Sequence, residues 1–180
     1  MRDFEDYCWR DYVSDEVLHI YSAYVRERAV GPHPALLVVH PGGVACGEAW
    51  QPPAARLLAE ARGRGLPVLH SLPPGAEALR ALAPKGGEDA IARPCESAFF
   101  SSDLERALRR RAAGSLIVCG GPSSGAVRAS AVEGKSFGYK VVLAEETVGD
   151  LSPFLHAMAL FDVAHKYADV MALGEVLEQL

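Results

Sequence analysis

The segment Leu116–Ala131, LIVCGGPSSGAVRASA, decides the fold, because it has the pattern of a strand that leads through a glycine-rich loop into a helix. Its first apolar residues are typical of a strand buried on both faces of a sheet. Gly120–Pro122 ends that strand, and Ser123 or Ser124 can cap a helix that extends from about residue 125 to residue 137. Backbone N–H groups at such a helix start suit an anion, so this loop is the first candidate for a functional site.

The flanking sequence repeats this alternation of apolar runs and helical patterns. Strands are expected at residues 35–39, 66–71, 115–119, 139–144 and 169–173, with a short extended piece at 91–93. Helices are expected at residues 53–64, 103–112, 125–137, 153–166 and 174–180. This order predicts an α/β fold with three layers (α/β/α), in which helices cover both faces of a mainly parallel, six-stranded, Rossmann-like sheet.

Ligands of such sheets bind in a crevice outside the carboxyl ends of the strands. The polar residues that follow expected strand ends are therefore the ones to consider: His40, His70, the loop 120–126, Glu145 and Glu146. For His70, a ligand contact and a structural role remain alternatives. The two glutamates are expected in a solvated loop, with one of them bonded to backbone N–H groups.

The first 34 residues differ from the rest of the chain, so we divide it into an N-terminal helical extension, 1–34, and an α/β domain, 35–180. Ser14 is expected to cap a helix that extends to Arg28. Its apolar residues recur at helical spacing and form one stripe: Val17, Ile20, Tyr21, Tyr24 and Val25. A single amphipathic helix needs a covering surface, which its own domain or a neighbouring subunit can supply.

The composition excludes several classes of partner. The 180 residues carry a formal net charge of -5 and no basic run, which argues against nucleic acid. No apolar run approaches the ~20 residues that a membrane span needs, and the N-terminus MRDFEDYCWR is too polar for a signal peptide, so we expect a cytoplasmic protein. The four cysteines are scattered without a C-x-x-C pair, so we expect no metal site, no disulfide framework and no cofactor.

Several stretches resemble the isochorismatase-like cysteine hydrolases, in particular the branch of N-carbamoylsarcosine amidohydrolase. They are ESAFFSSDL at 96–104, the segment 116–131, GYKVVLAEETVGDLSP at 138–153 and LFDVAHKYADVMALGEVL at 160–177. The resemblance implies the isochorismatase fold and a homo-oligomer, a dimer or tetramer that partly covers the N-terminal helix. It also implies hydrolysis of a small amide by a cysteine nucleophile, with an aspartate as base and a lysine beside it.

The chain departs from that pattern at each catalytic position. The resemblance places His40 where the family has its aspartate, Arg93 where it has its lysine, and Ala126 where it has its nucleophilic cysteine. A methyl group cannot attack a carbonyl. The family also uses an N–H donor next to a cis peptide bond, and here that position is Pro122, which has no N–H. The bond between Gly121 and Pro122 can still be cis, because X–Pro bonds adopt that form at low cost.

These departures exclude ordinary cysteine amidohydrolase activity and leave two hypotheses. In the first, the site is repurposed for non-covalent acid–base chemistry on a small anionic metabolite, with His40 as acid or base and Arg93 as anion clamp. Its further ligand-binding residues would be His70, Gly121, Pro122, Ser123, Ser124 and Gly125. In the second, the chain is a pseudoenzyme, a binding or structural subunit that assembles with itself or with an active paralogue.

The remaining candidates are expected to be structural. Arg128 matches a family arginine and is interpreted as structural, and Cys46 and Cys119 are interpreted as unactivated thiols. Phe99 and Phe100 are expected to pack in the core or line the pocket.

Overall fold

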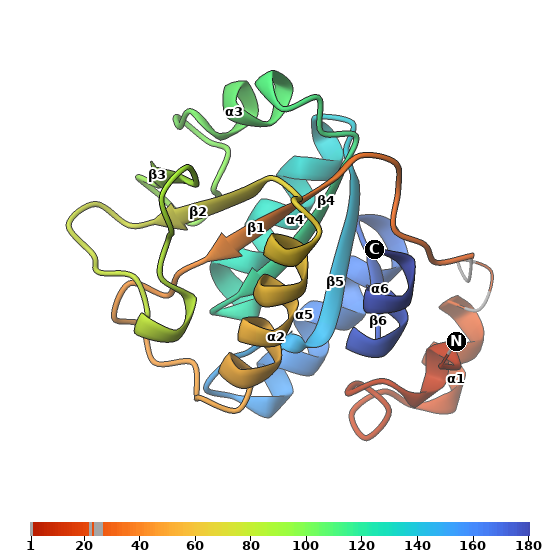
Figure 1. Ribbon diagram of the computed structural model, residues 1–180. Helices are drawn as coiled ribbons and strands as arrows, with labels where there is room; N and C mark the ends of the chain where they lie inside the picture. Colours follow the sequence, from red (N-terminus) through yellow and green to blue (C-terminus); the bar gives the residue numbers. More distant parts are fainter. Residues whose placement is uncertain (1, 22, 24–26) are drawn as a thin grey trace.

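The computed structural model describes residues 2–21, 23 and 27–180. Its centre is a six-stranded sheet with the order β3-β2-β1-β4-β5-β6, and every strand pair in it is parallel. The strands are β1 (Pro34–Val39), β2 (Val68–Leu72), β3 (Asp89–Ala92), β4 (Ser115–Gly120), β5 (Lys140–Val148) and β6 (Asp169–Met171). The strand order reverses between β1 and β4, and Figure 1 shows these strands at the centre of the sheet. The predicted three-layer, parallel α/β fold is confirmed.

Helices cover both faces of the sheet (Figure 1). One face packs against α2 (Gln51–Gly63) and α6 (Leu173–Gln179). The other packs against α3 (Leu104–Arg110), α4 (Arg128–Ser136) and α5 (Pro153–Lys166). Successive side chains of a strand point to opposite faces, so β1 supplies Leu36 and Val38 to the α2 face and Leu37 and Val39 to the α4 face. The same alternation continues past Val39 and directs the side chain of His40 toward the α2 face.

Two elements differ from the sequence-based expectation at the carboxyl edge of the sheet. The helix expected from residue 125 begins earlier, as a π-helical turn at Ser123–Val127 that continues into α4. The strand expected to end at residue 144 continues to Val148, because the pairing of β5 shifts past Val118 and resumes between Gly120 and Val148. Glu145 and Glu146 therefore belong to a strand, and the expectation of a loop is corrected.

The N-terminal segment packs against the same core as the rest of the chain. Trp9 is fully buried and Tyr7 nearly so, in the apolar cluster that also contains residues of α5 and β6. Figure 1 shows this segment beside α6 and β6 at the edge of the sheet. Arg28 connects it to the sheet, because its Nη1 donates to the Tyr7 hydroxyl and to the carbonyl of Val170 at 3.2 Å.

The helix of this extension, α1, spans Asp15–Tyr21. Leu18 is buried, and the ring of Tyr21 lies 5.4 Å from that of Phe161 on α5, so the domain itself covers this side of the helix. Ile20 is 60% exposed, so the domain does not cover the expected stripe at that position, and its cover by a second subunit stays a prediction. The two stripe residues Tyr24 and Val25 lie outside the described residues. None of the described helices is long and apolar enough to span a membrane.

Candidate functional site

His40 follows β1, and its imidazole is completely buried on the α2 face of the sheet. Its Nε2 lies 3.1 Å from Nδ1 of His70 on β2, and its Nδ1 accepts the backbone N–H of Leu79 at 3.3 Å. Nε2 of His70 lies 2.9 Å from Oε2 of Glu88. Arg62 of α2 donates to both oxygens of Glu88, at 2.7 and 2.8 Å. The histidines thus belong to a network that extends from the strand end to α2.

The hydrogen bonds of this network assign a proton to each ring. The bonds from Arg62 hold the pKa of Glu88 at about 2, so Glu88 is ionised and accepts the Nε2–H of His70. Nδ1 of His70 is then an acceptor for the Nε2–H of His40, whose own Nδ1 accepts from Leu79. Burial lowers the pKa of His40 to about 4 and also lowers the pKa of His70. Both rings are neutral, and both nitrogens of His40 are engaged within the protein.

Arg93 follows β3 and is also buried, with only 4% of its surface exposed. Its Nη2 donates to the carbonyl oxygen of His40 at 3.0 Å. Within the described part of the chain, Nε and Nη1 of Arg93 are buried and have no hydrogen-bond partner, and the same is true of Oγ of Ser71. Ser71 pairs in register with Val39 and Ile91, so it lies in the strand between the ends that carry His40 and Arg93.

Strand parity predicts that the side chains of His40 and Arg93 leave the sheet toward opposite faces. His40 has the parity of Val38, which packs on the α2 face, whereas Arg93 has the parity of Ile91, which packs on the α4 face. Their contact is made by the backbone carbonyl of His40. The hydrogen bond between the two residues thus leaves out the imidazole, although burial lowers the pKa of His40 most and Arg93 is near enough for its charge to help lower it. That both side chains bind one ligand stays a prediction.

The loop after β4 contains the expected cis peptide bond between Gly121 and Pro122. Neither Ser123 nor Ser124 caps the helix with its side chain. Ser124 instead donates from its N–H and hydroxyl to Oδ2 of Asp150, at 2.9 and 2.6 Å. The predicted serine cap is corrected, because Asp150 supplies the acceptor that the start of the helix needs.

Ala126 is fully buried in the core cluster, within the π-helical turn. Gly125 stands beside Glu96: a Cβ added at Gly125 would lie 3.0 Å from Oε2 of that residue. Burial lowers the pKa of Arg93, while the charge of Glu96 acts in the opposite direction. Glu96 belongs to the surroundings of Arg93 and was missed by sequence reasoning, although it stands only three residues further along IARPCESAFF.

The two glutamates of β5 bind backbone N–H groups from distant segments. Oε1 of Glu145 accepts from Cys8 at 2.6 Å, and Oε2 of Glu146 accepts from Leu173 at the start of α6 at 2.7 Å. Arg2 also contacts both carboxylates. We expected one of the two glutamates to accept a bond from a backbone N–H group, and both of them do.

The other expectations have mixed outcomes. Arg128 is structural, since its Nη2 donates to Asp162 of α5 at 2.6 Å. Phe99 is buried, but Phe100 is 61% exposed, which corrects its assignment to the core or a pocket wall. Cys119 is buried, and burial raises its pKa to about 12, as expected for an unreactive thiol.

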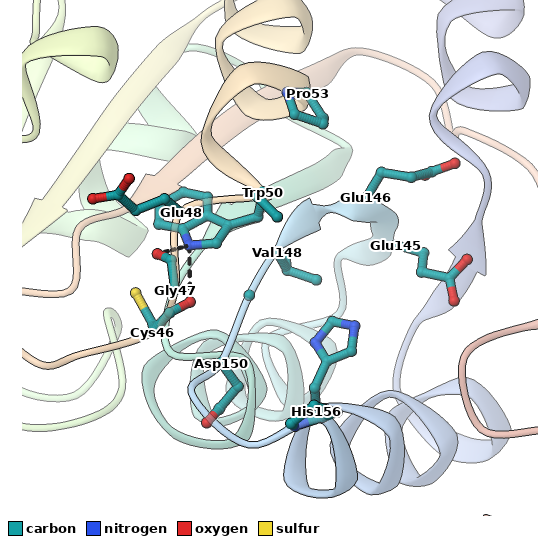
Figure 2. A pocket seen from close by; sticks show the side chains of 13 residues that line it. Cys46, Gly47, Glu48, Trp50, Pro53, Glu145, Glu146, Val148, Asp150 and His156 are labelled. Carbon is teal, nitrogen blue, oxygen red and sulfur yellow. Dashed lines mark hydrogen bonds between the residues drawn. The ribbon is translucent and has the colours of Figure 1, made fainter. Parts of the chain in front are cut away.

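A pocket of about 510 Å³ opens near the start of α2 and the start of α5 (Figure 2). Cys46, Trp50, Val148, Asp150 and His156 are among the residues that line it, whereas His40 and Arg93 are not. Burial raises the pKa of the Cys46 thiol, so this cysteine is not activated. Trp50, Asp150 and His156 were missed by sequence reasoning, although Asp150 and His156 follow the end of β5 closely in the sequence.

Comparison with known proteins identifies the family. Residues 42–175 match the isochorismatase domain. The chain belongs to the isochorismatase family. Solved structures share the fold: an isochorismatase from Pseudomonas putida superposes with a TM-score of 0.76 at 21% identity and covers 88% of this chain and 97% of that one. A family protein from Desulfovibrio vulgaris gives a TM-score of 0.74 at 25% identity, with 80% and 96% covered.

Two relatives of known name are amidohydrolases. Maleamate amidohydrolase of Pseudomonas putida is 32% identical over 120 residues, which are 65% of this chain and 56% of that protein. N-carbamoylsarcosine amidase of Arthrobacter is 31% identical over 99 residues, 55% of this chain and 38% of that protein. The matched regions thus span about half the length of these relatives or less.

Proposed function

We propose that this chain is an isochorismatase-family protein without cysteine hydrolase chemistry that binds a small carboxylate at Arg93. In this proposal, His40, Arg93 and Ala126 stand in place of the family's aspartate, lysine and cysteine. The observation that carries it is the guanidinium of Arg93, which is buried while its Nε and Nη1 have no partner within the described residues. An isochorismatase domain with this arrangement would retain a binding site after losing its nucleophile.

The chemistry of arginine favours a carboxylate as the ligand. A buried cation is costly unless it is paired, and arginine does not escape that cost by losing its proton. Its planar guanidinium donates two parallel hydrogen bonds to a carboxylate, either from Nε with Nη2 or from Nη1 with Nη2, so a carboxylate would give one of the two unpartnered nitrogens an acceptor while sharing Nη2 with the carbonyl of His40. The buried hydroxyl of Ser71, also without a partner among the described residues, is suited to a third bond. Maleamate, the substrate named for one relative, carries such a group.

The state of His40 favours the pseudoenzyme over the repurposed enzyme. A general acid or base must exchange a proton with its substrate, and both ring nitrogens of His40 are engaged with His70 and Leu79. The low pKa of His40 also keeps it unprotonated near neutral pH, so it is not an acid there. Acid–base catalysis would require this network to open, whereas anion binding requires no rearrangement of it.

We also propose that the protein forms a homo-oligomer. Apolar side chains gather at the start of α5, where Leu151 is 69% exposed, Phe154 52% and Leu155 48%. The ring of Tyr12 lies 5.7 Å from that of Phe154, so the N-terminal extension continues this surface. Exposed apolar patches of this kind mark interfaces between proteins. We propose that a second copy of the chain covers this patch. The alternative is that an active paralogue covers it.

The anion site is tested by binding and turnover with one compound. Maleamate is titrated into the wild type and into Arg93→Met by isothermal titration calorimetry, and ammonia release is followed in parallel. We expect binding without ammonia release in the wild type and at least about tenfold weaker binding in Arg93→Met. Arg110→Met, which removes an exposed arginine of α3, is the matched control. Ammonia release, or binding that Arg93→Met leaves unchanged, would contradict the proposal.

A further inference from the structure

The pocket at the start of α2 and α5 is separate from Arg93 and has its own chemistry. Trp50, Pro53, Val148 and Pro153 supply apolar surface. The indole is held in place: its Nε1 donates to the carbonyls of Cys46 and Gly47 at 3.1 Å. Its ring lies so close to Gly149 that a Cβ there would be 2.0 Å from the indole Cδ1. The apolar wall is therefore a fixed surface.

The charged groups of this pocket have one sign. Its lining contains four carboxylates, on Glu48, Glu145, Glu146 and Asp150, and contains no lysine or arginine among the described residues. Figure 2 shows Glu146 and Glu145 on one side of the pocket and Glu48 on the other. A cavity whose charged groups are all acidic attracts cations and repels anions.

The glutamate pair at the edge of this pocket already holds a cation of the chain itself. Nη1 of Arg2 donates to Oε2 of Glu145, and Nη2 donates to Oε1 of Glu146 at 3.5 Å. The side chains of Arg2 and Glu146 are 34% and 37% exposed, so solvent reaches this ion pair. The pair therefore has the geometry to bind a guanidinium or an ammonium group, and Arg2 near the chain terminus is a competitor for it.

His156 adds an oriented hydrogen-bond acceptor. Its Nδ1 lies 3.0 Å from Oγ of Ser123, and that Oγ lies 3.4 Å from Oδ2 of Asp150. When the serine hydroxyl donates to the carboxylate, its oxygen accepts Nδ1–H, and this arrangement leaves the lone pair on Nε2. Burial lowers the pKa of His156, which keeps the ring neutral. Figure 2 shows the ring pointing into the pocket, where Nε2 can accept an N–H.

We propose that this pocket binds a small organic cation, a primary ammonium or guanidinium group on an apolar body. The body packs against Trp50 and Val148, and the charged group lies between His156 and Glu146. The ligand competes with Arg2 for the glutamate pair. Arg93 does not line this pocket, so the proposal can be tested independently of the proposed carboxylate site.

The test compares three probes of one shape: 2-phenylethylamine, neutral 2-phenylethanol and anionic phenylacetate, each titrated into the full chain by NMR. We expect the amine to bind at least about tenfold more tightly than the other two. Glu146→Gln should weaken amine binding about fivefold, because it removes one partly exposed charge pair while keeping an acceptor for Leu173. Arg2→Ala should tighten binding, because it removes the competitor.

Two controls separate this site from the rest of the molecule. Glu178→Gln removes an exposed glutamate of α6 that does not line the pocket, and Arg93→Met disables the carboxylate site. Both should leave amine binding unchanged. Equal binding of amine and alcohol, no binding of the amine at millimolar concentration, or an unchanged affinity in Arg2→Ala would overturn the proposal. The Arg2→Ala measurement decides the matter even if Glu146→Gln does not fold.

Discussion

The buried network of His40, His70 and Glu88 predicts that the protein loses stability in mild acid. The perturbation is a change of pH from 7 to 5. Both rings are neutral in the folded state, and the hydrogen-bond chain has no place for another proton: Nδ1 of His40 already accepts from Leu79. A proton added there would replace an acceptor by a donor that faces another donor, in a site that is fully buried.

The magnitude follows from the pKa of His40. That pKa is about 4 in the folded state against an ordinary value of 6.5. The unfolded chain therefore binds more protons between these values, and the stability falls as the pH falls through that window. One pKa unit corresponds to about 1.4 kcal/mol, so the full cost is about 3 kcal/mol, and about 2 kcal/mol of it is lost between pH 7 and pH 5. His70, whose pKa is also lowered, adds to the loss in the same direction.

The assay is urea unfolding followed by circular dichroism at both pH values. His40→Gln should be less stable than the wild type at pH 7, because the bond to His70 is weakened, but should lose at least about 1 kcal/mol less on acidification. His33→Asn, which removes an exposed histidine and suits the positive φ of that position, is the matched control. If wild type and His40→Gln lose the same free energy between pH 7 and pH 5, the neutral, closed network is wrong.

Three further outcomes are expected. Ala126→Cys should not release measurable ammonia from maleamate or N-carbamoylsarcosine, because His40 and Arg93 still stand at the positions of the family's aspartate and lysine and Pro122 still lacks an oxyanion donor whose loss costs roughly 3 kcal/mol; clear turnover in this single variant would show that these groups are dispensable. Phe154→Ser should shift the mass measured by light scattering toward the 19.2 kDa monomer, and a wild type that is already monomeric would contradict the oligomer. Gly120→Ala should destabilise the protein by at least about 3 kcal/mol in thermal or urea unfolding. At this position φ is +123° and an added Cβ would lie 2.0 Å from a carbonyl oxygen of the neighbouring strand. Gly87→Ala, at φ +89° but in open space, should cost only about 1–2 kcal/mol, and equal losses at both positions would remove the steric argument.

The order of elements could be predicted from the sequence because it depends on local periodicity. Apolar runs such as residues 35–39 alternate with helical patterns such as 153–166, and the observed α5 spans Pro153–Lys166. Ser152 ahead of Pro153 caps that helix through the N–H of Leu155. The strand and helix patterns are determined by residues that are neighbours in the chain. The cis bond at Gly121-Pro122 is present as well, and its expectation came from the family resemblance.

The candidate site could be predicted in part. Its location at the carboxyl edge, and the residues His40 and Arg93, came from strand ends and from the family resemblance. The directions of these two side chains could not be predicted in the same way. A shift of one residue along a strand turns a side chain to the opposite face of the sheet. The imidazole of His40 contacts His70, whereas Arg93 donates to the backbone carbonyl of His40.

The sequence by itself determined the fold class, the position of the loop after β4 and the presence of alanine at residue 126. Only the tertiary structure decided that His40 is neutral and engaged, that Arg93 has buried donors without partners among the described residues, and that acidic side chains surround a pocket beside Trp50. The physical reason is the distance along the chain between the residues that interact. Strand and helix patterns arise within a few residues, whereas the partners that set protonation and charge come from segments such as Arg2 and Glu145, 143 residues apart.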